Sequence, residues 1–123
     1  VRWPRSGPRL DPHPQLLSRE PGPLIAHIVL LQFRPDTSPD QVVALREGLH
    51  GLRGAVPGIR HLSFGPNLAP GADEWPWVLV VNVADMSALQ RYAEHPAHRK
   101  VVEELLTPIR QGRLAVDVEL GDE

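Results

Sequence analysis

The chain has 123 residues, with 13 lysines and arginines, 15 aspartates and glutamates and a formal net charge of -2. This length suits one domain with a modest core, and the mixed charges provide no basic field for binding nucleic acid. The absence of cysteine excludes disulfides, thiolate catalysis and thiolate metal sites. No apolar run approaches the roughly 20 residues that span a bilayer. We therefore expect a soluble, cytoplasmic protein.

Residues 1–23 differ in composition from the rest of the chain. They contain six of the fourteen prolines and several arginines, with little apolar periodicity. Such a segment cannot bury enough surface to offset its ordering entropy, and it lacks the continuous apolar stretch of a secretory signal. The sequence therefore predicts a disordered Pro/Arg-rich tail at 1–23 and one domain at 24–121.

The domain is predicted to begin with a strand at 24–33, which is apolar on both faces apart from His27 and Gln32. His27 shares its face with Ile25, Val29, Leu31 and Phe33. A lone histidine on such a face is usually a core residue with satisfied hydrogen bonds. The alternative is that His27 faces a cavity.

A helix is predicted to start at Ser38-Pro39-Asp40-Gln41. Ser38 and Gln41 can form a capping box, and Pro39 suits the first helical position. One apolar stripe follows, made of Val42, Leu45, Leu49, Leu52 and Val56. Gly48 and Gly51 weaken the helix by up to about 1 kcal/mol each relative to alanine, and close packing is one reason for them. Pro57-Gly58 ends the helix.

Two further strands are predicted, at 59–68 and 75–83, separated by a Pro/Gly/Asp loop. In the first of them His61 lies opposite the apolar face, and we expect it at the surface. The second is mostly buried on both faces. Trp75 and Trp77 share a face in it, and we expect them in the core or a dimer interface rather than in a cofactor platform.

The stretch from Tyr92 to Leu106 predicts a helix, a corner and a second helix. Pro96 has no N–H and pushes His95 out of the helical region. One helix, capped near Asp85, should therefore end near Glu94, and the next should start at Pro96.

His98 and Tyr92 should both face inward at this corner. His98 lies three or four residues from the apolar positions Val101, Val102 and Leu105. Because the helix start disfavours a cation, we expect a neutral imidazole that can accept a proton. Tyr92 shares the inner face of the preceding turn with Leu89 and Ala93, so the phenol and the imidazole should meet.

A half-exposed final strand follows, with Leu114, Val116, Val118 and Leu120 alternating with more polar residues. The element order is thus βαββα(α)β, an α+β arrangement of the ferredoxin-like type with helices on one face of the sheet. The other face is apolar, and two copies can bury it by packing face to face as a dimeric α/β barrel. A homodimer is the expected state.

Three segments, HIVLLQFRPDTS, WVLVVNVADMSALQRY and YAEHPAHRKVVEELLTPI, resemble the stress-responsive A/B barrel (Dabb) family over Ile25 to Leu120. The resemblance implies the same dimeric barrel. A plant member is a polyketide cyclase that closes a ring by intramolecular aldol condensation. Its catalytic tyrosine and histidine fall on Tyr92 and His98, and His27 matches a pocket histidine of the first strand. Where that enzyme has a further histidine on the third strand, this chain has Trp77.

We assign catalytic roles to Tyr92 and His98, as hydrogen-bond donor and general base, and substrate contacts to His27, Trp77 and His95. In the structural alternative, His98 packs at the corner and the Tyr92 hydroxyl bonds to backbone. The ring of His95 is also expected to bond exposed helix-start amides. Because Pro96 breaks the helix between His95 and His98, we expect no metal site, and no cofactor.

Three functions remain open at the level of sequence, and with them the question of whether the protein is an enzyme. The first is a Dabb-type protein that binds or converts a small, largely apolar or aromatic molecule. The second is a non-catalytic, stress-related structural dimer. The third is a cofactor-independent monooxygenase, by analogy with related dimeric barrels. Phosphate-binding loops, nucleophile elbows and metalloprotease motifs do not occur in the sequence, so nucleotide-dependent and hydrolytic chemistry lack support.

Overall fold

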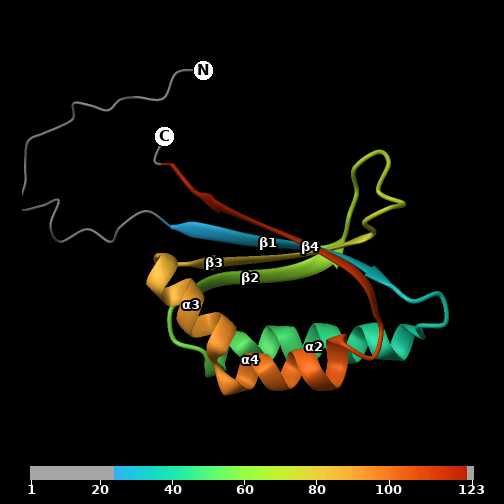
Figure 1. Cartoon of the computed structure of the whole chain (residues 1–123), viewed down its shortest axis with the longest axis horizontal. Coiled ribbons are helices and arrows are strands. Elements are labelled where there is room, and N and C mark those ends of the chain that lie inside the picture. The colour runs from blue at the N-terminus through green and yellow to red at the C-terminus, as the bar shows by residue number, and fades with distance from the viewer. Residues whose placement is uncertain (1–23, 122–123) are drawn as a thin grey trace, which may run out of the picture.

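The structure, a computed structural model, describes residues 24–121. The tail predicted at 1–23 lies outside the described residues. The elements run in the order β1 (Ile25–Phe33), α2 (Pro39–Ala55), β2 (Ile59–Pro66), β3 (Trp77–Val83), α3 (Met86–Glu94), α4 (Pro96–Val101), the π-helical turn η1 (Val102–Leu106) and β4 (Arg110–Glu119) (Figure 1). This confirms the predicted βαββα(α)β order and the ferredoxin-like α+β fold.

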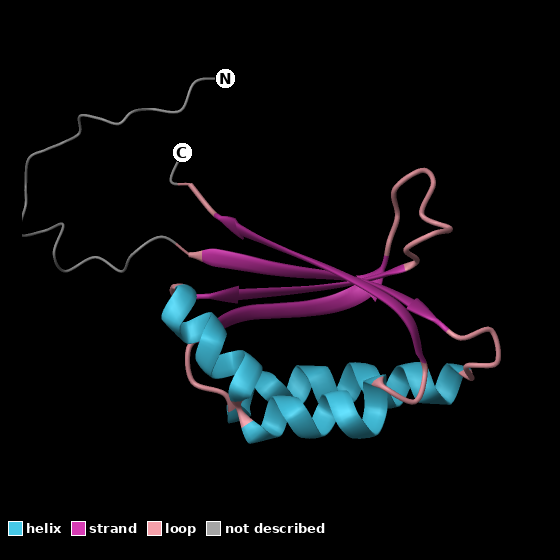
Figure 2. Cartoon of the chain, viewed as in Figure 1, coloured by secondary structure: helices cyan, strands magenta, loops and turns pink. Residues whose placement is uncertain are grey.

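The strands form one four-stranded antiparallel sheet in the order β2-β3-β1-β4. The helices all lie on one side of this sheet (Figure 2). The core fills the space between the two layers, and its most buried members include Leu31, Leu45, Leu52, Val81, Val83, Tyr92 and Ile109. Burial of each such aliphatic side chain contributes roughly 1.5–3 kcal/mol. β1 is central in the sheet and β4 is an edge strand.

Helix α2 begins as its sequence predicts. The Ser38 hydroxyl accepts a hydrogen bond from the Gln41 N–H at 3.2 Å, and the Gln41 side chain accepts one from the Ser38 N–H at 2.9 Å. The helix ends at Ala55, and Gly58 follows at φ 95°, where a residue with a side chain would be strained. Both ends of the helix are therefore determined by local sequence.

Gly48 lets α2 lie close to the α4–η1 helix. A Cβ atom added at Gly48 would lie 2.6 Å from Cδ1 of Leu105 and 3.5 Å from Cγ2 of Val101, whereas one added at Gly51 would meet nothing within 4 Å. In η1 the Thr107 N–H donates to the Val102 carbonyl at 2.8 Å, the five-residue spacing of a π turn. The close packing suggested by the sequence thus holds for Gly48 and not for Gly51.

This difference predicts opposite outcomes for two matched substitutions. Gly51→Ala should raise the free energy of unfolding by up to about 1 kcal/mol, because alanine favours the helix and meets open space. Gly48→Ala gains the same propensity but forces Leu105 from its position, so we expect a protein less stable than Gly51→Ala and no more stable than the wild type. Urea denaturation followed by circular dichroism measures both. Equal stabilisation by the two changes would show that Gly48 is not needed for helix packing.

The corner between α3 and α4 matches its prediction closely. Asp85 caps α3 by accepting from the Ala88 N–H at 2.8 Å, and His95, at φ -65° and ψ 136°, separates the two helices. Tyr92 is buried on the inner face of α3 together with Ala88 and Leu89. Ala93 does not share that face as predicted, because it is exposed and the turn of the helix carries it outward.

The loop between β2 and β3 is longer than predicted at both ends. β2 ends at Pro66 rather than Leu68, and β3 begins at Trp77 rather than Trp75. Pro76 has no N–H for a ladder bond. Instead, the Asn67 side chain donates to the Trp75 carbonyl at 2.8 Å and the Asn67 N–H donates to the Pro76 carbonyl at 2.8 Å, so these bonds close the loop.

The face of the sheet opposite the helices is apolar over three neighbouring strands. In the strand register Ile28 pairs with Val80 on one side and Val116 on the other, and Leu30 pairs with Val78 and Leu114. Leu114, Val116 and Val118 are 45%, 46% and 43% exposed. We call this surface the open face, made of Ile28, Leu30, Val78, Val80, Leu114, Val116 and Val118. Apolar surfaces of this kind mark sites of interaction.

No helix within residues 24–121 has both the length and the apolar character needed to cross a bilayer.

Candidate active site

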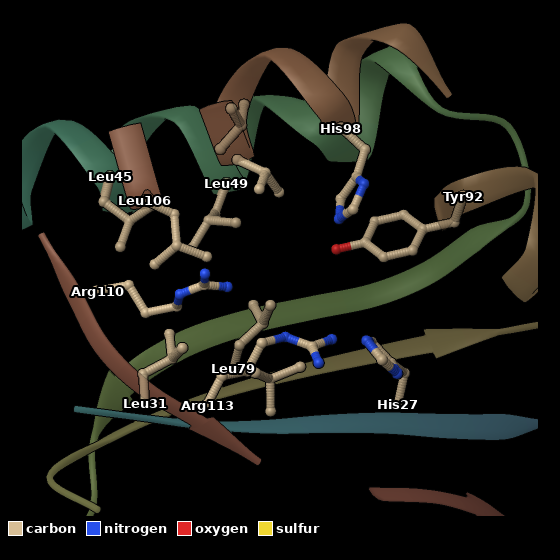
Figure 3. Close-up of a pocket in the computed structure, with 13 residues that line it drawn as sticks. His27, Leu31, Leu45, Leu49, Leu79, Tyr92, His98, Leu106, Arg110 and Arg113 are labelled. Carbon is tan, nitrogen blue, oxygen red and sulfur yellow. The ribbon is translucent and has the colours of Figure 1, made fainter. Parts of the chain in front are cut away.

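A cavity of about 220 Å³ lies between the sheet and the helices. Its walls are mainly apolar and come from β1, β3, α2, α4 and η1, with Val29, Leu31, Leu45, Leu49, Leu79 and Leu106 among them. Three rings line one end, those of His27 from β1, Tyr92 from α3 and His98 from α4 (Figure 3). The fold thus brings His27 to Tyr92 and His98, which lie much later in the sequence.

The Tyr92 ring pairs with each of the two histidine rings. The ring centroids of Tyr92 and His98 lie 4.4 Å apart, and those of His27 and Tyr92 lie 6.0 Å apart in an edge-on arrangement. Tyr92 is only 1% exposed. The predicted meeting of phenol and imidazole at the corner is therefore observed, and His27 joins it from the neighbouring strand.

The His98 ring is held in one orientation by the backbone. Its Nδ1 lies 3.1 Å from the carbonyl oxygen of Ala93. Since a carbonyl only accepts, we assign the proton to Nδ1, which leaves the lone pair of Nε2 free. Figure 3 shows one ring nitrogen directed toward the cavity and the Tyr92 hydroxyl. This is the arrangement of a neutral imidazole that can accept a proton from a bound molecule.

Burial keeps His98 neutral at pH 7. Desolvation lowers the pKa of its imidazole below the usual 6.5, and the hydrogen bond with Ala93 opposes this effect. The charges of His27, Arg113 and His95 lower the pKa further. A neutral ring was also expected from the helix dipole, but the main cause is desolvation of the half-buried ring.

Tyr92 is the complementary group. Burial raises the pKa of its phenol to about 12, and the nearby charge of Arg113 partly opposes the rise. The hydroxyl is therefore protonated at pH 7 and able to donate a hydrogen bond. Within residues 24–121 no protein group is hydrogen-bonded to it, which differs from the structural alternative of a hydroxyl bonded to backbone.

His27 has a partner that the sequence analysis missed. Its Nδ1 lies 2.6 Å from Oδ1 of Asp117, which faces it across the β1–β4 ladder. A carboxylate on one ring nitrogen fixes the orientation of an imidazole. Arg110 and Arg113, which line the cavity from β4, were not predicted either. Alternation in the final strand places Arg113 and Asp117 on one face, but the sequence does not show that this face meets the cavity.

Trp77 lies outside this cavity, contrary to the expectation that it lines the same cavity as His27, Tyr92 and His98. It pairs with Leu31, four residues from His27 and so about 13 Å along the strand. There it stacks on Phe64 with ring centroids 5.3 Å apart and lines a separate groove. The physical reason for this correction is that the Trp77 ring is stacked on Phe64 and Phe33, on the side of the separate groove.

His95 does not line the cavity either. Its Nδ1 accepts a hydrogen bond from the Ala97 N–H at 3.0 Å, so its ring caps α4. The capping role expected from sequence is observed, whereas the substrate contact assigned to His95 finds no place in this cavity. In the described part of the chain, no three histidine, aspartate or glutamate side chains are grouped so as to hold a metal ion.

Comparison with known proteins decides the family. The family model described as the stress responsive A/B barrel domain, Dabb, matches residues 25–120. The chain belongs to the Dabb family. This confirms the resemblance seen in the sequence and covers nearly all of the residues that the structure describes. No curated protein sequence matches this Dabb protein significantly.

Solved structures agree on the fold. A dimeric ferredoxin-like protein of unknown function from Thermobifida fusca is 28% identical, with a TM-score of 0.71 over 80% of this chain and 92% of its own. A Dabb family protein with a ferredoxin-like fold from Mesorhizobium loti is 23% identical, with a TM-score of 0.69 over 80% and 99%. The hydroxynitrile lyase of Passiflora edulis is 15% identical, with a TM-score of 0.73 over 84% and 98%. The last two likenesses concern fold alone.

Proposed function

We propose that this Dabb protein binds a small, largely apolar carbonyl compound in its cavity and removes a proton from the carbon next to the carbonyl, as in an aldol-type ring closure. One observation supports this proposal above the others. A neutral imidazole and a protonated phenol line the same end of an apolar cavity, with their ring centroids 4.4 Å apart. Such a pair is suited to general base catalysis with stabilisation of the resulting oxyanion.

The reaction proceeds in three proposed steps. Nε2 of His98 takes a proton from the α-carbon, and the electron pair of the C–H bond passes into an enolate. The Tyr92 hydroxyl donates a hydrogen bond to the enolate oxygen as negative charge develops there. The enolate carbon then attacks a second carbonyl of the same molecule, and a C–C bond forms. The new alkoxide takes a proton from the His98 imidazolium, which restores the base.

The surroundings favour these steps. The apolar walls lower the local dielectric constant, so that a hydrogen bond from Tyr92 to an enolate is stronger there than in water. His27, oriented by Asp117 at 2.6 Å, lies edge-on to Tyr92 and contacts the substrate from β1 in our proposal. The Passiflora hydroxynitrile lyase is an enzyme with the same fold, so this fold accommodates catalysis in at least one protein.

We further propose that the protein is a homodimer, assembled through the open face. Structural neighbours from Thermobifida fusca, Jannaschia and Bacteroides fragilis, at 28%, 27% and 26% identity, are described as dimeric. Packing two open faces together removes Leu114, Val116 and Val118 from water and completes a barrel. The cavity lies on the helix side of the sheet, so this assembly leaves it accessible.

The Tyr92→Phe variant tests the proposed chemistry. Proton removal is measured as exchange of α-hydrogens in D₂O, followed by NMR over a panel of apolar ketones and β-keto thioesters. The wild type should accelerate exchange with at least one compound, and Tyr92→Phe should slow it by about 10²–10³-fold, the effect of removing one oxyanion donor. Phenylalanine keeps the ring in the core, so the thermal unfolding midpoint is the control for folding.

Two results would contradict this proposal. One is exchange by Tyr92→Phe at the wild-type rate, which would remove the phenol from the mechanism. The other is a wild type that accelerates exchange with no member of the panel. That second result would favour the non-catalytic dimer, in which the histidines only hold the corner and the strand pair together.

A further inference from the structure

We propose that the natural ligand of the cavity carries a carboxylate, held by Arg110 and Arg113 on β4, with its apolar body among the leucines of the interior. This inference names the substrate class of the proposed function and rests on it only in using the same cavity. Three observations support it. The charged groups that line the cavity are positive, no carboxylate of the described residues forms an ion pair with them, and the walls are apolar.

Among residues 24–121, two arginines and no aspartate or glutamate line the cavity. Figure 3 shows both guanidinium groups among the apolar side chains. Within residues 24–121 the only pairing of a basic group with a carboxylate within 4.0 Å is that of His27 with Asp117. No carboxylate of those residues is therefore close enough to neutralise Arg110 or Arg113. A bound anion would supply the missing charge.

Asp117 forms no ion pair with Arg113, although both residues line the adjoining pocket beside His27. The two residues lie on the same face of β4 but four positions apart, about 13 Å along the strand. Asp117 is already engaged by Nδ1 of His27 at 2.6 Å. The charge of Arg113 also acts within the cavity, since it lowers the pKa of both Tyr92 and His98. The positive field at the cavity is thus present in the folded protein before any ligand binds.

The position of β4 explains why charged groups are tolerated here. β4 is an edge strand, and Arg110 and Arg113 are exposed, so water solvates the guanidinium groups without a ligand. The interior beyond them is lined by leucine and valine side chains. An amphipathic anion matches both regions, because its charged end remains at the arginines while its apolar body leaves water.

A carboxylate fits these features best. The planar guanidinium groups of arginine match the geometry of a carboxylate and form paired charge-assisted hydrogen bonds with it. The volume of about 220 Å³ is below the range of about 300–1,000 Å³ typical of sites for drug-sized ligands. The ligand is therefore small. Arg110 lies at the end of the cavity away from the Tyr92–His98 pair, and Arg113 is drawn between Arg110 and His27 (Figure 3). A carboxylate drawn toward Arg110 therefore belongs to a keto acid whose reacting carbonyl is remote from its carboxylate.

Isothermal titration calorimetry with octanoate and octanamide tests this inference. The two probes share length and apolar area and differ in charge. We expect octanoate to bind the wild type at least about tenfold more tightly than octanamide, as a charge-assisted hydrogen bond provides. The Arg110→Gln/Arg113→Gln double variant should lose at least about tenfold in octanoate affinity and keep its affinity for octanamide. Arg60→Gln, on the opposite edge strand β2, is the matched control and should change neither value.

Several outcomes would overturn the inference. Equal affinity of the wild type for octanoate and octanamide would do so without any variant, so the test does not depend on how well the variants fold. Unchanged octanoate binding by the double variant would also overturn it. Tighter binding of octyl phosphate than of octanoate would replace the carboxylate by a phosphate.

The inference and the proposed catalysis can fail separately. If octanoate binds as expected while no carbonyl compound exchanges its α-hydrogens, the inference stands and the proposed reaction is wrong. If neutral ketones exchange while octanoate shows no preference over octanamide, the reaction stands and the carboxylate is wrong.

Discussion

The Val116→Lys variant is expected to be a monomer at concentrations at which the wild type is a dimer. Val116 lies in the middle of β4 and pairs with Ile28 on the open face, where it is 46% exposed in the single chain. A lysine is tolerated there in a monomer because its ammonium group reaches water. In the proposed dimer two symmetry-related lysines would be buried without partners. Since each such burial costs several kcal/mol, the dissociation constant should rise by about 10³-fold or more.

Sedimentation velocity over a range of concentrations measures this change. The matched control is Val43→Lys, which makes the same substitution on α2, where Val43 is 45% exposed on the helix side of the molecule. It should remain dimeric with an unchanged circular dichroism spectrum. A Val116→Lys protein that dimerises like the wild type would show that the open face is not the interface, and dissociation of Val43→Lys would place the interface on the helices.

Replacement of His98 by alanine should lower the rate of α-hydrogen exchange by about 10²–10⁴-fold, the usual contribution of a general base. The reason is that Nε2 of His98 carries no proton and can act as the base. The proton of this neutral ring is on Nδ1, which lies 3.1 Å from the Ala93 carbonyl oxygen. His98→Gln separates the two roles of the ring, because an amide can still donate to that carbonyl but cannot act as a base. Both variants should therefore be inactive, and His98→Gln should be the more stable of the two.

Added imidazole provides a further test, since it can enter the space that alanine leaves and restore part of the lost rate. His50→Ala is the matched control, because His50 is exposed on α2 and does not line the cavity. A His98→Ala protein with wild-type exchange rates would exclude His98 as the base. An equal loss in His50→Ala would indicate that the assay reports stability rather than chemistry.

The pH dependence follows from the direction of the His98 pKa shift. Burial lowers this pKa below 6.5, so the base form persists down to pH 6.5, and the exchange rate should fall only at lower pH. Stability should follow the same direction. Between the folded and unfolded pKa values the unfolded chain binds more protons, so the free energy of unfolding falls as the pH drops below 6.5. His98→Gln should lack this part of the decrease, which urea denaturation at several pH values measures.

Local sequence was sufficient to predict most of the elements. The capping box of Ser38 and Gln41, the Asp85 cap and the break at Pro96 each depend on residues within a few positions of one another, and each occurs as expected. Elements bounded by such local hydrogen bonds keep their ends in many tertiary contexts. The strand ends at Leu68 and Trp75 were predicted wrongly, because Asn67 closes the loop through bonds that strand periodicity does not reveal.

The site was predictable only in part, for a related reason. Helical spacing places Tyr92 and His98 on the inner sides of neighbouring helices, and their meeting follows from the corner between them. Trp77 was assigned to the same cavity because alternation along a strand shows which face of the sheet a side chain is on. It does not show which side chains of other elements surround it. Only the tertiary structure shows that the Trp77 ring stacks on Phe33 and Phe64 and lines a separate groove.

The sequence by itself therefore determined the order of the elements, the family, the corner and an apolar face left for a partner. The tertiary structure alone decided that Asp117 meets His27 and that Arg110 and Arg113 line the cavity. Alternation along β4 divides its residues into two faces. Which face meets the helix side is fixed by pairing with β1, a contact between segments about 90 residues apart in the chain. Local sequence carries no information on such a long-range pairing until the fold exists.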